Sequence, residues 1–426
     1  MKMSILITVI CSIIITGDAL KTDAQLDKQI TPPIVRPDTA ISDTVLTKSY
    51  KSDDFYNQMD VVDLVGTVFP DVKRKKADSS KIKNTKFRMG GPVPAAGFTL
   101  STGFAVAISA NGSFCTDKDA NRSSILSECA YTQYKQLILP LQTSIWTKGN
   151  KYNLITDWHY LYYPSYTYGL GGYTTLDDGY IVNYHAIKLR NTILRQIYKD
   201  LYAGPGYNID YFWNITEVNP PKNKLTDFER FGCANTEIAS SLTFNISYDT
   251  RQNSINPEGG SFVNIIYDPH PVSLGNPANW QSLIFDLRKY YIFPANSENI
   301  LAFWSYDWFT LAGKPPYLEL PYTGGDEYGN FGRGYVIGRY RGANVVYLEG
   351  EYRFRILNNG LISGVVFANA QSFTEQTTGR YETISPAWGP GIRLKFNKYS
   401  RTNACLDYGF GIKGSKGFFV NLGEVF

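Results

Sequence analysis

Apolar and polar residues alternate along the C-terminal third of the sequence. Between 346 and 356, the even positions carry mainly apolar or small side chains, whereas the odd positions carry Tyr347 and then only glutamate and arginine. A period of two predicts a β-strand with one apolar and one polar face. The same parity recurs in the segments 361–371, 388–396, 406–412 and 417–426. The pattern therefore predicts five consecutive two-faced strands.

Ten earlier segments of strand-like length, rich in aromatic and β-branched residues, are also predicted to be strands. They cover residues 98–109, 125–134, 135–146, 152–163, 181–197, 207–216, 240–248, 261–268, 282–293 and 300–310. With the final five, about fifteen strands are expected. A sixteenth, missed or split near the start, would make the number even, as in single-chain outer-membrane barrels.

Two-faced strands occur in soluble β-sandwiches and in membrane β-barrels, so alternation alone leaves both open. The apolar run 5–15, between Lys2 and Ala19, predicts a signal peptide over residues 1–19. An exported chain without a later run of about 20 apolar residues can cross a membrane only as a barrel. Aromatic residues crowd the segment 158–173, as in an interfacial girdle. We therefore expect an all-β, transmembrane antiparallel β-barrel of sixteen strands in a Gram-negative outer membrane.

The residues between leader and barrel are predicted to form a short periplasmic extension, 20–88, with the barrel occupying 89–426. One amphipathic helix is expected over about 53–69, capped by Ser52 and ended by Pro70. Its apolar residues repeat at helical spacing: Phe55, Met59, Val62, Val65 and Phe69. This is too little apolar material for an independent domain.

Composition narrows the possible partners. The chain has 32 Tyr and 24 Phe but only three His, and its formal net charge is +4. Most of the excess charge lies in the run 71–86, which is typical of a solvated linker, so we predict no nucleic-acid partner. Four cysteines follow the leader. Cys115 and Cys129 either form a disulfide within one hairpin region or, like the other two, stay unpaired.

The most unusual segment is YGNFGRGYVIGRYRG, residues 328–342, which places three arginines among five glycines and three tyrosines. Glycines permit close turns, and a guanidinium can hold a fixed carboxylate through paired hydrogen bonds. On these residues alone, Arg333 is either a residue that binds a carboxylate or an exposed loop arginine.

An ordered set of segments resembles the barrel of the bacterial surface antigen superfamily, which includes the BamA/TamA insertion factors and the two-partner secretion transporters. The segments are GRGYVIGRYRG, EYRFRI, GVVFANAQSF, GPGIRLKF, DYGFGI and the final NLGEVF. DTRQNSINPEGG, residues 249–260, resembles another recurring strand or hairpin motif, with Asp249, Arg251, Pro257 and Gly259 matching. The resemblance covers essentially all of residues 90–426.

This resemblance implies that the sixth extracellular loop folds back into the lumen. The tip that anchors it would be Gly332, Arg333, Gly334 and Tyr335. By strand parity, Asp407, Glu351 and Asn369 face inward and are the expected partners, with Asp407 first. The family often carries an acidic residue where Asn369 stands.

The last predicted strand carries the alternation Phe418, Val420, Leu422 and Phe426. Outer-membrane barrel sequences commonly finish on such an apolar-faced strand with a terminal aromatic residue. We expect these four residues to form a C-terminal strand signal.

The resemblance implies an outer-membrane barrel that helps to insert or translocate proteins at a weak seam between its first and last strands. The extension lacks the pattern of a POTRA domain, so a member without such domains is expected. Its expected partners are outer-membrane lipid, unfolded clients and a separate periplasmic protein; no cofactor, nucleotide or metal is expected. The alternative is a passive channel or structural barrel plugged by the loop.

An enzyme is the third possibility, because Asp157 and His159 lie on one face of a strand, as an oriented base would. No nucleophile motif accompanies them, and an interfacial histidine beside aromatic residues is the simpler explanation. We therefore predict no enzymatic activity.

Overall fold

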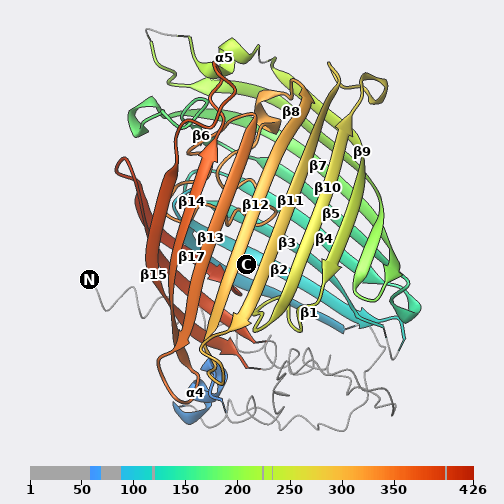
Figure 1. The fold of residues 1–426 in the computed structure, drawn as a ribbon, viewed down its shortest axis with the longest axis vertical. Helices are drawn as coiled ribbons and strands as arrows, with labels where there is room; N and C mark the ends of the chain where they lie inside the picture. Colours follow the sequence, from blue (N-terminus) through green and yellow to red (C-terminus); the bar gives the residue numbers. More distant parts are fainter. Residues whose placement is uncertain (1–57, 69–87, 118–119, 223–224, 233, 399–400) are drawn as a thin grey trace.

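The computed structural model describes residues 58–68, 88–117, 120–222, 225–232, 234–398 and 401–426. The described chain forms a single 17-stranded sheet that curls into a barrel (Figure 1). The expected signal peptide 1–19, the charged run 71–86 and Cys233 lie outside the described residues. The structure confirms the all-β antiparallel architecture.

Each strand pairs antiparallel with its neighbour in sequence. The short β6 continues the line of β5, because both strands pair with the same edge of β7. The barrel wall therefore has sixteen strand positions. The strands are β1 (Arg88–Thr99), β2 (Gly103–Cys115), β3 (Arg122–Thr132), β4 (Leu137–Trp146), β5 (Tyr152–Tyr162), β6 (Ser165–Thr167), β7 (Tyr180–Tyr198), β8 (Leu201–Val218), β9 (Thr236–Asp249), β10 (Gly260–His270), β11 (Trp280–Ile292), β12 (Ile300–Gly313), β13 (Asn344–Arg355), β14 (Ile362–Phe373), β15 (Ser385–Asn397), β16 (Thr402–Gly411) and β17 (Lys416–Leu422).

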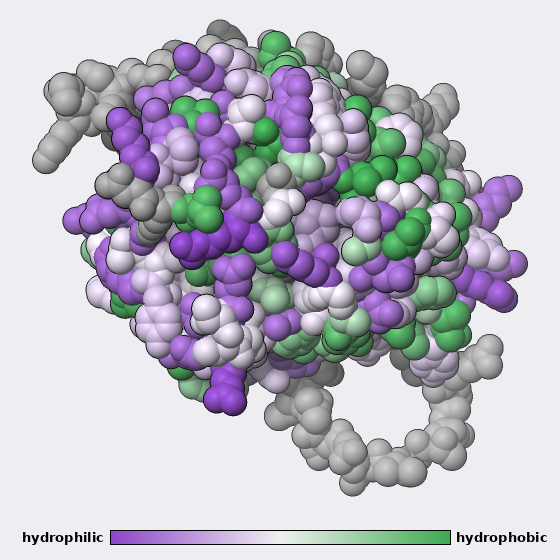
Figure 2. Space-filling model, turned by 90° about the horizontal axis from the view of Figure 1, so that it is seen from above, coloured by the Kyte–Doolittle hydropathy of each residue, from purple (hydrophilic) through white to green (hydrophobic). Residues whose placement is uncertain are grey.

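Helical structure is sparse in the described residues. The helices are α4 (Val61–Val68) and α5 (Asp227–Phe231), and single 3-10 turns cover Lys148–Asn150, Leu176–Asp178, Val272–Leu274 and Tyr317–Glu319. The two α-helices lie at opposite ends of the barrel (Figure 1). Viewed from the α5 end, the surface is mostly hydrophilic, with scattered hydrophobic residues (Figure 2). In the described part of the chain, no helix has the length and apolar character needed to cross a membrane.

The first and last strands meet without pairing. Within the described residues, β1 forms a ladder only with β2, and β17 only with β16. The two end strands are nevertheless close at the α5 end, because a side chain at Gly417 would collide with Leu100 in the turn after β1. The wall therefore contains one seam, between β1 and β17.

The two faces of the strands differ as the alternation predicted. On β13, Leu348 is 58% exposed, whereas its neighbour Glu349 is 3% exposed. The outward positions of other strands carry a belt of large apolar side chains. Examples are Phe104, Ile108, Phe244, Trp388 and Ile392. The polar residues that alternate with this belt point into the barrel.

Two predictions about local structure need correction. The segment 98–109 is not one strand: β1 ends at Thr99, and β2 begins at Gly103. The glycines and prolines of β1 hid it from the pattern. The final strand stops at Leu422, so Phe426 is not part of it. Of the two alternatives left open for Cys115 and Cys129, the structure shows the unpaired one: both are free, on different rungs of the β2–β3 hairpin.

Of the helix expected over 53–69, the structure shows Val61–Val68, and residues 53–57 and 69 lie outside the described residues. Residues 58–60 are not helical, so the prediction that the helix includes them is wrong. This helix packs at the end of the barrel by polar contacts. Lys398 Nζ donates to Asp63 at 2.8 Å, and Met59 N donates to the carbonyl of Asn359 at 2.8 Å.

Candidate functional site

The long connection between β12 and β13, residues 314–343, forms the centre of the candidate site; we call it the inner segment. Its Phe331, Tyr335 and Tyr340 are at most 2% exposed. They share an apolar cluster with inward residues of the late strands, including Trp304 and Tyr347. The inner segment thus packs on the strand face opposite the lipid-facing apolar belt.

Glycines on both sides allow the inner segment to approach the wall. Gly332 and Gly334 have φ values of +89° and +106°, in the left-handed region that other residues rarely adopt. On the facing strand, a Cβ at Gly409 would lie 2.6 Å from the Cα of Gly334, and one at Gly411 would lie 2.7 Å from the Tyr335 ring. Backbone therefore meets backbone at Gly334 and Gly409, and neither position has room for a side chain.

Between these glycines, Arg333 reaches three carboxylates. Nη1 donates to Asp407 Oδ2 at 2.7 Å, and Nη2 donates to Glu351 and to Glu349. The Arg333 side chain is only 1% exposed, and its guanidinium lies 3.9 Å from the centre of the Phe367 ring. Arg333 therefore lies in the interior of the barrel and is not an exposed loop arginine.

The surrounding charges keep Arg333 ionised. Burial alone would lower its pKa, but the carboxylates of Glu349, Glu351 and Asp407 raise the pKa well above its usual range. Two further arginines share these acids: Arg353 binds Glu351, and Arg393 binds Asp407. With Glu424, which also binds Arg393, three cations face four carboxylates. We call these seven residues the arginine cluster: Arg333, Arg353, Arg393, Glu349, Glu351, Asp407 and Glu424.

The other residues predicted at the anchor take different parts. Asn369 is buried, but its Nδ2 donates to the main-chain oxygen of Arg333 at 2.9 Å and not to the guanidinium system. Tyr335 donates its hydroxyl hydrogen to the carbonyl of Pro386 at 2.6 Å and accepts from Ile412 N at 3.1 Å. Asn369 therefore holds the backbone, and Tyr335 ties the inner segment to the ends of two strands.

Sequence reasoning did not identify Glu349 or Arg393 as members of the site. Both lie on inward faces, so parity was a usable signal for each. Glu349 stands two residues before Glu351 on the same face and opposite Asn369 on β14. Which inward carboxylates an arginine reaches depends on register between strands, and a single sequence does not specify it.

The motif at 249–260 forms the turn between β9 and β10, at the α4 end. Arg251 donates to both carboxylate oxygens of Asp249 at 2.9 Å, and its guanidinium lies 4.3 Å from the Phe262 ring centre. The carbonyl of Pro257 accepts from Arg353 Nη1 at 3.3 Å. A Cβ added at Gly259 would meet no atom within 4 Å, so no close contact requires a glycine there.

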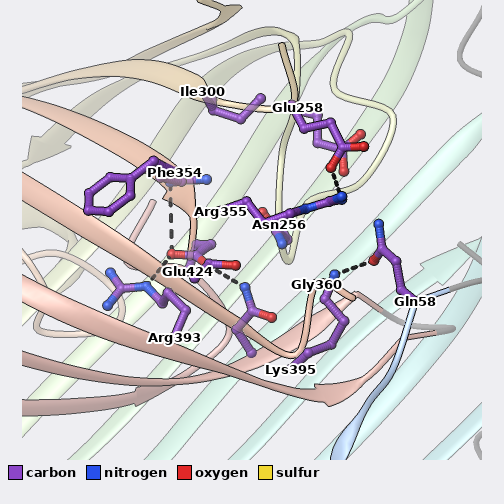
Figure 3. Close-up of a pocket in the computed structure, with 14 residues that line it drawn as sticks. Gln58, Asn256, Glu258, Ile300, Phe354, Arg355, Gly360, Arg393, Lys395 and Glu424 are labelled. Carbon is purple, nitrogen blue, oxygen red and sulfur yellow. Dashed lines mark hydrogen bonds and ion pairs between the residues drawn. The ribbon is translucent and has the colours of Figure 1, made fainter. Parts of the chain in front are cut away.

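A small cavity of about 70 Å³ opens beside this turn (Figure 3). Its lining mixes charges of both signs, with Glu258 and Glu424 facing Arg355 and Lys395. Lys395 Nζ donates to Gln58, which precedes α4. The cavity therefore lies where the α4 region, the β9–β10 turn and the arginine cluster approach one another.

The residues of the predicted C-terminal signal divide into two groups. Phe418, Val420 and Leu422 are exposed on the outward face of β17, as parity predicted. Phe426 is 2% exposed and lies inside the barrel. Gly423, with φ +96°, turns the chain inward after the strand, which breaks the alternation.

On the inward face of β5, His159 Nε2 lies 3.1 Å from Asp157 Oδ1, and Asp157 also accepts from Gln142 at 2.9 Å. The described residues contain no group of three or more His, Cys, Asp or Glu placed to hold a metal ion. The arginine cluster is thus the most elaborate polar arrangement at the site.

Comparisons with known proteins assign the fold. The sequence model of the Omp85 superfamily domain matches residues 143–424. Among solved structures, BamA from Haemophilus ducreyi lacking POTRA domains 1–3 is 13% identical, with a TM-score of 0.51, covering 80% of this chain and 69% of that one.

Two further matches are CdiB from Acinetobacter baumannii and from Escherichia coli, at 12% and 9% identity, both with TM-scores of 0.49. They cover 78% and 77% of this chain and 59% of each CdiB chain. A search of curated sequences finds no significant match. Because the family match spans well over half of the sequence, the protein belongs to the Omp85 superfamily and is an outer-membrane β-barrel.

Proposed function

We propose that this barrel assists the insertion of proteins into the outer membrane or their translocation across it. The observation that carries the proposal is the seam. Within the described residues, β1 and β17 pair only with β2 and β16, so each presents one edge without ladder hydrogen bonds. An unpaired strand edge is a template for another strand.

Residues 332–335 would act as an anchor that keeps the inner segment in the lumen. Arg333 connects β13, through Glu349 and Glu351, with β16, through Asp407. β16 is the strand on which β17 pairs. The anchor therefore fixes the wall next to the seam and leaves the seam itself as the weakest boundary of the barrel.

The expected partners follow from this proposal. Lipid surrounds the apolar belt, and an unfolded protein strand is the client that an open β edge suits. A separate periplasmic protein would supply client capture. We propose no nucleic-acid partner and no cofactor.

A passive channel is the second candidate, and the early strands favour it. Their inward polar side chains bond mainly across neighbouring strands, as Ser109 does with Glu128 at 2.6 Å and Gln142 with Asp157 at 2.9 Å. A polar inner wall of this kind suits a water-filled path.

The test measures the folding rate of a small, urea-denatured barrel into liposomes with and without this protein. We expect acceleration by the wild type and loss of most of that acceleration in Arg333→Ala. Arg190→Ala is the matched control. Arg190 is also an inward arginine, bonded to Asp210 at 2.6 Å, but Asp210 keeps Lys188 at 3.3 Å when Arg190 is removed.

Liposomes must first be shown to contain folded protein. If folded wild type gives no acceleration but shows steady conductance, the channel replaces insertion as the function. If Arg190→Ala loses as much activity as Arg333→Ala, the anchor is not specific and the role proposed for residues 332–335 is wrong.

A further inference from the structure

The last four residues of the sequence leave the barrel wall and enter its interior; we call Gly423–Phe426 the tail. β17 ends at Leu422, and Gly423 turns the chain with φ +96°. Figure 1 places the end of the chain within the outline of the barrel. The tail therefore adds no length to the strand that forms the seam.

The tail occupies an apolar seat. Val425 and Phe426 are 3% and 2% exposed. The Phe426 ring stacks on Trp304, with centroids 5.2 Å apart and planes at 30°, and lies 6.2 Å from the Tyr290 ring. Removing an aromatic side chain from water and packing it against other aromatic rings contributes strongly to the free energy of binding.

Charged and polar groups fix the position of the tail in this seat. Glu424 accepts from Arg393 Nε and from Asn403 Nδ2, both at 2.7 Å, as Figure 3 shows in part. Arg353 Nη2 donates to the main-chain oxygen of Phe426 at 2.8 Å. Arg353 and Arg393 also belong to the arginine cluster, so the tail and Arg333 share one electrostatic network.

A turn from the opposite wall closes over the tail. The carbonyl of Ile255 accepts from Glu424 N at 2.9 Å. The same turn reaches Arg353 through the carbonyl of Pro257 and Arg401 through Glu258, at 3.3 and 3.4 Å. This turn connects β9 with β10, about half of the circumference away from β17. The tail therefore bridges two distant parts of the wall.

The inner segment also holds the tail. Asn330 Nδ2 donates to the carbonyl of Val425 at 2.9 Å, and its Oδ1 accepts from Asn421 Nδ2 on β17 at 3.1 Å. One residue of the inner segment thus contacts both the tail and the seam strand. Apart from Gly423 N, which donates to the carbonyl of Asn403, the tail is held outside the strand ladder.

We propose that this seat is an internal peptide-binding site for a glycine turn followed by an acidic, an apolar and an aromatic residue, with the tail as its resident ligand. Occupation of the seat couples β17 to the inner segment and to the β9–β10 turn. With the seat empty, β17 keeps only its short ladder with β16, at residues 404–410, and the Asn421 hydrogen bond to Asn330. Any role of a loosened β17 at the seam rests on the proposed function, whereas the binding of a peptide in the seat does not.

Hydrogen exchange read by mass spectrometry tests the coupling on the whole protein in detergent micelles. In Phe426→Ala, we expect amide exchange to rise at least tenfold in the tail, in β17 and in the β9–β10 turn, with β10 unchanged. Phe418→Ala is the matched control, because Phe418 is a phenylalanine on β17 that is 48% exposed on the outward face of the strand. A rise confined to the tail, or an equal rise in all strands, would overturn the proposal.

A reciprocal variant starts from the other side of the seat. Glu258→Gln weakens the contact between the turn and Arg401 without touching the tail. Since coupling between two sites is mutual, exchange of the Glu424 amide should rise in this variant several-fold. An unchanged Glu424 amide, in a variant whose turn exchanges faster, would contradict the coupling.

The binding property has a direct test in a variant that lacks residues 423–426. The amidated peptide Gly-Glu-Val-Phe, added in excess, should restore slow exchange in the β9–β10 turn, and the scrambled peptide Phe-Gly-Val-Glu should not. Equal effects of the two peptides, or no effect of either, would show that the seat is not a binding site. None of these three measurements requires insertion activity, so this proposal and the proposed function can fail separately.

Discussion

The inner faces of the late and early strands are built differently. Along β12 to β16, inward residues are buried beneath the inner segment, and the arginine cluster and a set of aromatic rings fill the interior. Along β2 to β5, inward residues are half-buried and bond in pairs between adjacent strands. One side of the barrel has a packed interior, and the other has a polar lining.

The seam lies between these two regions, because β17 pairs with β16 of the packed side and β1 pairs with β2 of the polar side. Packing fixes side-chain positions, because removal of any part leaves a cavity or an unpaired charge. A polar lining exchanges its hydrogen bonds with water at little cost. Substitutions on the packed side should therefore be costly, and equivalent ones on the polar side should be tolerated.

The largest effect is expected for Arg333→Ala. It leaves the buried carboxylates of Glu349, Glu351 and Asp407 without their shared cation, and breaking a buried ion pair costs about 3–5 kcal/mol. The measurement is the urea midpoint of unfolding, and the readout is the gel mobility of the folded barrel. Arg333→Lys keeps the charge but not the paired geometry, so it should recover part of the loss. A midpoint unchanged in both variants contradicts the packed interior.

A pH dependence should arise at the α5 end of the inner segment. Burial raises the pKa of Glu319 to about 7, with Asp210 adding to the shift and Lys188 and Arg190 opposing it. The folded state thus binds this proton more tightly than the unfolded state. Its stabilising contribution is complete below pH ~4.5 and is lost as the pH rises through about 7. The shift corresponds to roughly 3–4 kcal/mol at most, at about 1.4 kcal/mol per unit.

Comparing urea midpoints at pH 5 and pH 8 checks this prediction. The difference between the two should be smaller in Glu319→Gln than in the wild type, because glutamine cannot titrate. Glu382→Gln, at an exposed position, is the control and should behave as the wild type does. An unaltered difference in Glu319→Gln would assign the pH dependence to other groups.

A smaller effect is expected where the inner segment touches the wall. In Gly409→Ala, the new Cβ would lie 2.6 Å from backbone atoms of Gly334, which cannot move aside as a side chain would. Overpacking of this kind costs about 1–3 kcal/mol. Gly350→Ala is the control, because its nearest neighbour is a Phe303 ring carbon at 3.6 Å. Equal urea midpoints for the two variants would mean that the inner segment is not held closely at Gly409.

The sequence predicted the part of this site that depends on parity. Alternation placed Asp407 and Glu351 on inward faces, and both contact Arg333. Parity also covered Glu349, but which acids share one guanidinium depends on inter-strand register. The position of Phe426 was wrong, because a turn at Gly423 ends the period of two. β1 was missed because glycine and proline carry little strand signal.

The smallest effect is expected on the polar side, and it is the sharpest check of the comparison. Ser109 donates to Glu128, and Gln142 to Asp157, each across one pair of neighbouring strands. In Ser109→Ala or Gln142→Ala, the remaining carboxylate is only half-buried, so water can replace the lost donor. The free energy of unfolding, obtained from the urea midpoint, should then fall by less than about 1 kcal/mol. A loss near that of Arg333→Ala would show that the early strands also enclose a dry interior. A small loss means that the barrel owes its rigidity to one side of its wall, which would leave β1 as the more mobile edge of the seam.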